Sequence, residues 1–180
     1  PGPTHKEDLQ SGSLSAVMGG VTAVFEMPNT SPLTITNATV EDKLARAKGR
    51  MHCDHAFFVG ATHHNPRDLA GMERLPGVCG VKIFMGASTG DLLVEDDAGV
   101  LAVLRGGTRR VAIHSEDEFV LRENRRLARE GDWTSHPDVR SVESAVSATI
   151  RLIRLAREAR RRIHVLHVTT AEEISILAAA

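Results

Sequence analysis

The chain has 180 residues, with 22 Lys and Arg against 23 Asp and Glu, and 42% of its residues are hydrophobic. This composition fits one soluble globular domain, and the net charge of −1 gives no reason to expect a nucleic-acid or membrane partner. No apolar run is long enough to span a bilayer, and no signal-peptide pattern is present. Two cysteines are too few for a disulfide framework, so we expect a cytoplasmic protein.

Five short apolar runs predict buried strands, and helical patterns separate them. The strand runs are 21–27, 56–59, 78–85, 111–114 and 163–168. The helical patterns cover roughly 5–18, 39–48, 66–74, 96–105, 116–130 and 141–161, and a further one begins near 171. Because the strand runs are apolar nearly throughout, they favour a parallel sheet that is covered on both faces.

Three helix starts fit the capping-box pattern, in which a hydroxyl caps the first turn and a carboxylate reaches back to the cap N–H. They are Thr4–Glu7, Ser115–Glu118 and Thr170–Glu173. We expect the acidic residues at Asp96–Asp97 and within Ser115–Glu118 to complement helix dipoles. The arginine-rich stretch 151–162 is expected to be the solvated face of a helix.

The repeated order of strand, turn and helix predicts right-handed βαβ units, which build either a barrel or an open doubly wound sheet. The first strand ends in Met27–Thr30 and lacks the glycine fingerprint of a nucleotide-binding open sheet. The sequence therefore favours an α/β fold of the (β/α)₈ TIM-barrel type. Such a barrel needs eight strands and about 250 residues. We expect residues 1–180 to be a single incomplete barrel domain from a longer protein, since the chain starts at Pro1 without a methionine.

Lys82 is the most informative residue, because it lies inside the apolar run Gly80–Gly86. Burial disfavours a charged lysine and lowers its pKa. His114 and His167 lie at or near the ends of two further predicted strands. In a barrel the carboxyl ends of the strands form the active site, so these three residues predict a metal site there. Alternation along 163–168 would place His167 toward the barrel interior and His164 outward under a helix.

Other roles for these side chains are open at this point. The lysine alone could pair with a carboxylate, or act as a general base or Schiff-base nucleophile. Beside two histidines, its amine can react with CO₂ to form a carbamate, an anion able to bridge two cations. We expect the loop Gly86–Gly90 to be a flexible turn beside the site. Four further histidines are expected mostly on the surface, with one as a minor candidate to line the mouth: His52, His55, His63 and His64.

Several motifs resemble those of dihydroorotases in the amidohydrolase superfamily. Met27–Pro32 is similar to their MPNTxP signature, and Gly80–Phe84 resembles the strand with their carboxylated lysine. Ile113–Asp117 and Leu166–Thr169 resemble the strands with their two later metal histidines. The resemblance implies a distorted (β/α)₈ barrel with one or two zinc ions. It also implies reversible cyclisation of N-carbamoyl-L-aspartate to L-dihydroorotate in pyrimidine synthesis.

Carried over residue by residue, the resemblance implies that carboxylated Lys82 bridges the metals. His114 and His167 would bind the second metal, and Asn29 would hydrogen-bond the substrate carboxylate. The family's first-strand His-x-His pair and its last-strand catalytic aspartate have no counterpart in residues 1–180. We therefore expect no catalytic proton shuttle in this chain, no activity from these residues alone, and a small molecule as the partner, with a homo-oligomer left open.

Two alternatives to a dihydroorotase remain. Hydantoinases and allantoinases share the barrel and the lysine but usually differ at the MPNTxP signature. A non-catalytic dihydroorotase-like subunit, kept as a scaffold for a partner such as aspartate transcarbamoylase, is the other alternative. A catalytic parent needs the His-x-His pair upstream and the aspartate downstream.

Overall fold

The computed structural model describes residues 4–88 and 90–180, and its strands form one parallel sheet in chain order. The strands are β1 (Ala23–Glu26), β2 (Asp54–Gly60), β3 (Val78–Phe84), β4 (Val111–His114) and β5 (Ile163–Val165). The helices are α1 (Leu9–Met18), α2 (Asn37–Ala47), α3 (Leu69–Met72), α4 (Asp97–Arg105), α5 (Glu118–Asn124), α6 (His136–Val139), α7 (Val142–Ala159) and α8 (Ala171–Ala178). Short 3₁₀ turns cover Gly90–Leu92, Arg125–Leu127 and Trp133–Ser135.

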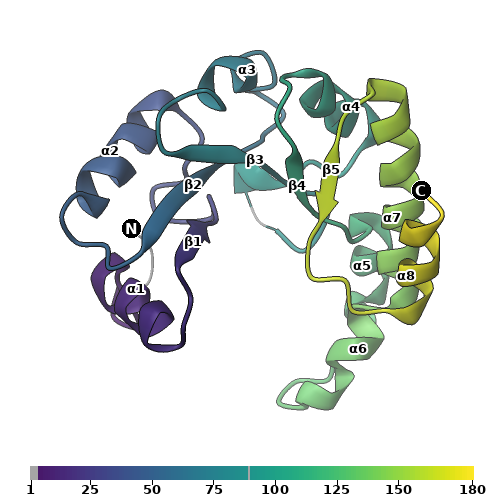
Figure 1. Cartoon of the computed structure of the whole chain (residues 1–180). Coiled ribbons are helices and arrows are strands. Elements are labelled where there is room, and N and C mark those ends of the chain that lie inside the picture. The colour runs from purple at the N-terminus through teal and green to yellow at the C-terminus, as the bar shows by residue number, and fades with distance from the viewer. Residues whose placement is uncertain (1–3, 89) are drawn as a thin grey trace.

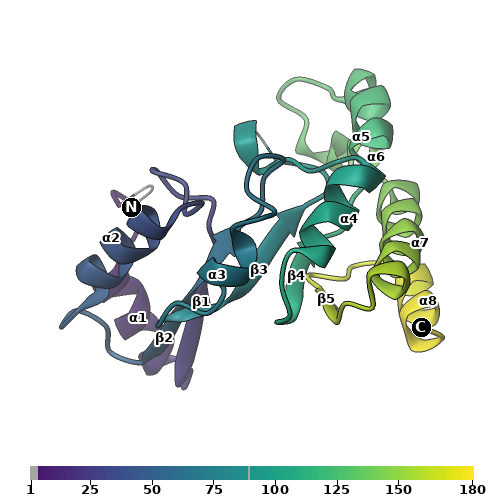
Figure 2. The same cartoon turned by 90° about the horizontal axis from the view of Figure 1, so that it is seen from above.

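The sheet curls, and the helices cover its convex side (Figures 1 and 2). The hydrophobic core lies between the strands and these helices, where Val59, Ile83, Ile113 and Leu152 are fully buried. Neighbouring parallel strands in chain order require a helical crossover each time, as the sequence predicted. The five strands thus form an open, curled part of a (β/α)₈ barrel.

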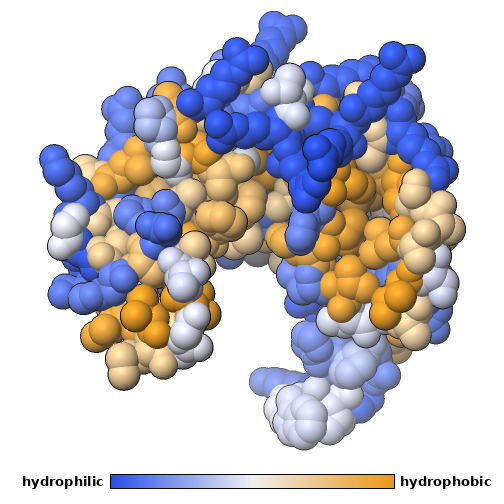
Figure 3. All heavy atoms as spheres, viewed as in Figure 1, coloured by the Kyte–Doolittle hydropathy of each residue, from blue (hydrophilic) through white to orange (hydrophobic). Residues whose placement is uncertain are grey.

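The concave side of the sheet is open. Within residues 4–88 and 90–180, β1 and β5 each pair with one neighbour only. Phe25 of β1 is 60% exposed, although its ring makes an edge-to-face contact with Phe58 at 6.4 Å. Figure 3 shows the hollow that this curl leaves, with hydrophobic surface on both of its sides.

Helix α1 begins later than the sequence predicted. Its N-cap is Asp8, whose carboxylate accepts a hydrogen bond from the Ser11 amide at 2.8 Å. The Ser11 hydroxyl in turn accepts from the Asp8 amide at 3.0 Å, which completes the capping box. Thr4 therefore does not cap this helix, because a carboxylate nearer to the apolar run takes the free amide.

The two other predicted caps differ from each other. Asp117, and not Ser115, caps α5 by accepting from the Phe119 amide at 3.0 Å. Thr170 caps α8 as predicted, since its hydroxyl accepts from the Glu173 amide at 3.2 Å. Asp96 caps α4 as a helix N-terminal charge, which was also predicted.

A buried ion pair joins the loops at the amino ends of the strands. Glu73 is fully buried and accepts from Arg161 Nη2 at 2.9 Å and from the Thr108 amide at 2.6 Å. The prediction of a solvated arginine face is therefore wrong for Arg161, and also for Arg151, whose side chain is 17% exposed and pairs with Asp117 at 3.1 Å. The contacts of Glu73 stabilise the end of the sheet opposite to the predicted site, whereas the pair of Arg151 and Asp117 lies at the carboxyl end of β4.

No helix in the described part of the chain has the length and apolar character needed to cross a membrane.

Candidate metal site at the carboxyl ends of the strands

Lys82 lies on the face of β3 that is turned toward the hollow. Its neighbours Val81 and Ile83 are in the helix-side core, so alternation directs Lys82 the other way. The side chain is buried, with Nζ donating to the Ile83 carbonyl at 2.6 Å and lying 3.6 Å from the centre of the Phe84 ring. Burial lowers the pKa of Lys82 to about 7. The neutral amine, which is the nucleophilic form, is therefore accessible near neutral pH.

A second buried lysine shows what an ordinary partner looks like. Lys43 of α2 lies 2.9 Å from the Glu26 carboxylate and donates to the Met27 carbonyl at 3.1 Å. Its pattern within a helix gave no sign of burial, and the sequence analysis missed it. Lys82 has no such carboxylate partner among the residues described. Of the two, only Lys82 keeps its amine unpaired with an acid.

The two predicted histidines meet beside Lys82. His114 ends β4, and its Nδ1 lies 2.9 Å from Nε2 of His167. The Phe84 ring connects this pair with the lysine, because its centre lies 6.0 Å from that of His114 and 3.6 Å from Lys82 Nζ. Burial lowers the pKa of His167, and the nearby His114 lowers it further. A neutral imidazole is the form that binds a metal.

His167 reaches this place by a turn and not by strand alternation. Strand β5 ends at Val165, and His167 has a left-handed backbone with φ of 38°. Ile163 and Val165 pack against the helix-side core, while His164 pairs in register with Ala112 and is exposed. The prediction that His164 packs outward under a helix is therefore wrong.

Glu116 and Arg140 complete the cluster, and sequence reasoning missed both roles. The Glu116 carboxylate contacts His114 Nε2 and the Arg140 guanidinium, whose Nε donates to Oε1 at 2.9 Å. Burial raises the pKa of Glu116, but its hydrogen bonds with His114 and Arg140 outweigh burial and lower the pKa to about 2. Glu116 does not complement a helix dipole, because α5 begins at Glu118. The position of Glu116, two residues after His114, was the feature of the sequence that could have indicated this contact.

A buried hydrogen-bond chain fixes the segment that follows His167. The Ser115 hydroxyl lies 2.9 Å from that of Thr149, which donates to Glu173 at 2.8 Å. Thr170 also donates to Glu173, at 2.8 Å. The end of β4 is thereby tied through α7 to the start of α8.

The loop after β3 packs closely against the loop after β4. A Cβ added to Gly86 would lie 2.6 Å from the backbone oxygen of Glu116. The buried Glu118 carboxylate accepts from the Ala87 amide at 3.1 Å, which ties this loop to α5. Thr89, in the predicted turn, lies outside the described residues.

Asn29 is not brought to the histidine pair. It is exposed in the loop after β1, two strands from Lys82.

The four other histidines lie away from the pair as well. Among the described residues, one group of three acidic or histidine side chains has donor atoms close enough for an ion: His63, Glu95 and Asp96. The His63 side chain is 40% exposed, and Arg122 already pairs with Glu95 at 3.5 Å. We interpret this group as a surface ion-pair cluster. His52 and His64 are exposed and His55 is half-buried, which agrees with the prediction that they lie mostly at the surface.

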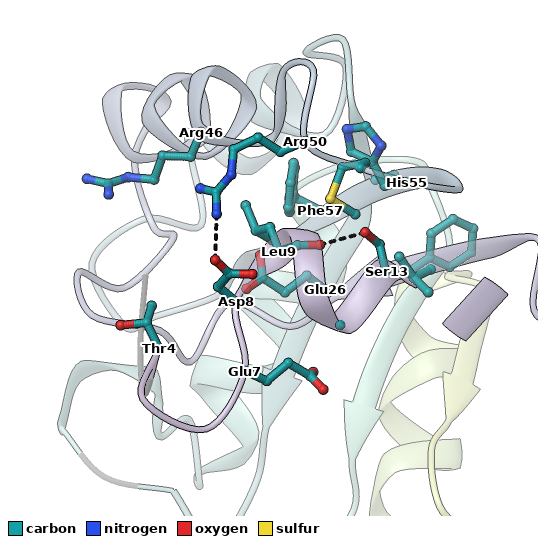
Figure 4. Close-up of a pocket in the computed structure, with 15 residues that line it drawn as sticks. Thr4, Glu7, Asp8, Leu9, Ser13, Glu26, Arg46, Arg50, His55 and Phe57 are labelled. Atoms are coloured by element: carbon teal, nitrogen blue, oxygen red, sulfur yellow. Dashed lines mark hydrogen bonds and ion pairs between the residues drawn. The ribbon is translucent and has the colours of Figure 1, made fainter. Parts of the chain in front are cut away.

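Two cavities differ in their relation to the site. One of about 400 Å³ is lined by Glu116, Arg140 and His167, among others, and so adjoins the cluster. Another of about 450 Å³ lies between α1, α2 and the β1–β2 strands, beside the pair of Asp8 and Arg50 at 2.7 Å (Figure 4). None of the three predicted metal residues lines the second cavity. The first cavity is therefore the one to consider for a small molecule.

No family model matches the chain. An allantoinase from Salmonella paratyphi B is 32% identical over an aligned length of 185. The alignment covers 96% of this chain and 40% of that protein, and an allantoinase from Salmonella newport matches equally. The L-hydantoinase (dihydropyrimidinase) of Arthrobacter aurescens superimposes with a TM-score of 0.86 at 24% identity, over 96% of this chain and 40% of that one. A dihydropyrimidinase from Brevibacillus agri gives 0.82 at 24% identity, over 96% and 39%. The chain spans about two fifths of the relatives that it matches.

The structural likeness confirms the barrel fold, and the sequence likeness to allantoinases favours one of the two alternatives over a dihydroorotase. The curated relatives reported above carry the name allantoinase, and the structural neighbours carry the names hydantoinase and dihydropyrimidinase. By sequence, the chain is thus similar to part of the allantoinases, and the solved hydantoinase and dihydropyrimidinase structures share its fold.

Proposed function

We propose that this chain supplies the central strands and part of the metal centre of a cyclic amidohydrolase of the allantoinase and hydantoinase type. Such an enzyme opens an amide bond in a small nitrogen-containing ring. The observation that carries the proposal is the approach of His114 Nδ1 and His167 Nε2 to 2.9 Å, next to a buried Lys82 without an acidic partner. The likeness to allantoinases supports the same conclusion.

The donor set fits a divalent metal. Imidazole nitrogens bind zinc at about 2.0–2.1 Å, and two nitrogens 2.9 Å apart can contact one ion. Lys82, as a carbamate, would add an anionic ligand from the neighbouring strand. When bound, the metal supplies Lewis acidity toward the amide carbonyl and acidifies water. We propose zinc, one or two ions, with the carbamate as the bridge.

The remaining parts of the site belong to the same proposal. Five strands do not close a barrel of eight, so we place the His-x-His pair and the proton-shuttling aspartate on strands outside residues 1–180. Within the chain, His114 and His167 hold the metal, and the cavity beside His167 offers room for a ring-shaped substrate. From the loop after β1, outside the lining of that cavity, Asn29 would hydrogen-bond a polar group of a substrate that extends across the hollow.

A dihydroorotase is the second candidate, and one observation favours it. The MPNTxP signature at Met27–Pro32 is typical of that family. The same metal ligands would serve this reaction, so only the substrate separates the two candidates.

A substrate panel with the full-length protein that contains this chain tests the proposal. We expect zinc-dependent hydrolysis of allantoin or of a 5-substituted hydantoin, with little or no turnover of dihydroorotate. The His167→Ala variant should lose at least 100-fold in kcat/KM. The matched control is His164→Ala, which removes an exposed histidine of the same segment and should keep the wild-type rate.

The other outcomes are equally informative. Turnover of dihydroorotate alone would select the second candidate. Hydrolysis of none of the three rings by a folded protein would contradict both and would favour the non-catalytic scaffold. Equal losses in the two histidine variants would contradict the assignment of His167.

A further inference from the structure

We infer that Glu116, clamped by Arg140, is the positioning residue that fixes the tautomer and orientation of His114. It holds the proton on Nε2 and leaves the lone pair of Nδ1 directed toward His167. The expected effect on metal affinity rests on the proposed function. The orientation of the ring itself is argued from side-chain contacts alone.

The contact with Glu116 decides which nitrogen of His114 is the donor and which is the acceptor. An ionised carboxylate can only accept, so the His114 nitrogen that contacts Glu116 must be the one that carries hydrogen. That nitrogen is Nε2. A neutral imidazole has one N–H, and Nδ1 is therefore the acceptor. Nδ1 is the nitrogen that lies 2.9 Å from His167 Nε2, so the free lone pair is at the proposed metal position.

Arg140 holds the Glu116 carboxylate through both of its oxygens. Arg140 donates from Nε to Oε1 at 2.9 Å and from Nη2 to Oε2, so the contact is bidentate. Arg140 Nη2 lies 3.3 Å from His114 Nε2, and both nitrogens are donors. They therefore share the oxygen Oε2 and do not bond to each other. The arginine thus fixes the carboxylate in the orientation in which it accepts the hydrogen bond from His114 Nε2.

The contact between His114 and Glu116 is largely shielded from water. The side chains of His114 and Glu116 are only 10% and 12% exposed, so water does not compete strongly for these contacts. The backbone of Glu116 cannot retreat toward the loop after β3, because the Gly86 position lies against its carbonyl. A carboxylate that accepts from the second nitrogen of a metal-bound histidine fixes its tautomer, and loss of such a partner typically weakens metal binding 10–100-fold.

The test uses Glu116→Gln and Arg140→Met in the full-length protein. Matched controls are Glu143→Gln and Arg126→Met, which change exposed side chains of the same types. The first readout is the pair of ring ¹⁵N chemical shifts of His114 in the metal-free protein at pH 8. The second readout is the zinc dissociation constant from competition with a chelator.

We expect the wild type to show His114 with hydrogen on Nε2, and Glu116→Gln to show a mixture of the two tautomers. Zinc binding should weaken 10–100-fold in Glu116→Gln and at least several-fold in Arg140→Met, with the controls unchanged. Hydrogen on Nδ1 of His114 in the wild type would overturn the inference, and so would wild-type zinc affinity in Glu116→Gln. If the wild type binds no zinc, the proposed function fails, while the tautomer readout still decides the positioning role.

Discussion

At the scale of single residues, two equally buried lysines differ in what surrounds them. Lys43 has a carboxylate at 2.9 Å, whereas Lys82 has a backbone carbonyl and an aromatic ring. Burying an amine without an acidic partner costs free energy, and an apolar side chain of similar length avoids that cost. A position that keeps such an amine is therefore better explained by chemistry than by stability.

This difference predicts opposite effects of one substitution. In the metal-free protein, Lys82→Met is expected to keep or raise the free energy of unfolding, by up to about 1 kcal/mol. Lys43→Met leaves Glu26 without its partner and is expected to lower it by about 2 kcal/mol, which allows for the partial exposure of that carboxylate. Urea unfolding measures both. Equal losses at the two positions would show that Lys82 is a structural lysine.

Glu73 predicts a dependence of stability on pH. Burial raises its pKa, but hydrogen bonds from the Thr108 and Arg109 amides and the charge of Arg161 outweigh burial and lower the pKa below the usual 4.5. A carboxyl with a lowered pKa in the folded state contributes stability above its unfolded pKa and loses it as the pH falls through the folded value.

The test compares Glu73→Gln with the wild type across this range. At pH 7 the variant should be less stable by about 3 kcal/mol, since it leaves a buried guanidinium unpaired. The difference should shrink steadily below about pH 4.5. Glu41→Gln, an exposed glutamate of α2, serves as the control and should follow the wild type. A difference that stays constant from pH 7 to pH 3 would contradict this account.

The sequence predicts individual residues where their surroundings are unusual. Lys82 stands out because a charged side chain interrupts an apolar strand, and His114 because it ends one. Glu116 and Arg140 are not found in this way, since polar residues in loops are ordinary. Arg140 contacts His114 from 26 positions further along the chain, and no local pattern records that contact.

At the scale of elements, the periodic patterns in the sequence predict that a helix or strand is present better than they predict where it begins and ends. All five strands were predicted, because each coincides with a mainly apolar run between turns. The helix starts shifted where several polar side chains compete for one free amide, as at Asp8 and Asp117. Alternation holds within β5, but it does not extend to His167, because the chain leaves the strand at Val165 and turns with a positive φ at His167. The face of His164 was therefore assigned wrongly, because it was inferred from His167. A period of two holds only while the backbone stays extended.

The contact between the loops after β3 and β4 gives a prediction for two glycines. A Cβ at Gly86 would meet the Glu116 carbonyl at 2.6 Å, whereas a Cβ at Gly71 in α3 meets nothing within 4 Å. Gly86→Ala is therefore expected to cost about 2 kcal/mol and to weaken zinc binding by displacing Glu116. Gly71→Ala should leave metal binding unchanged and raise stability by up to about 1 kcal/mol. Thermal unfolding and zinc titration of both variants measure this, and a harmless Gly86→Ala would refute the tight loop contact.

At the scale of the whole molecule, the sequence predicted the class of fold but not the substrate, and the place of the site stays a prediction. The parallel strands and their order follow from buried apolar runs joined by helices, and the proposed metal residues were inferred from their positions at strand ends. The ring that such an enzyme accepts depends on the loops above these ends, where small changes in side chains alter recognition without changing the core. The MPNTxP signature lies in such a loop, which is why it and the allantoinase relatives favour different substrates.

We propose that Lys82, His114 and His167 hold metal together, with Lys82 as a carbamate. The most direct test of this claim is the zinc content per chain of the full-length protein, equilibrated with zinc and bicarbonate, for the wild type, Lys82→Arg and the control His164→Ala. Arginine stays charged and cannot form a carbamate, so we expect Lys82→Arg to lose at least one zinc equivalent while the control retains the wild-type content. Full zinc content in Lys82→Arg would contradict the claim.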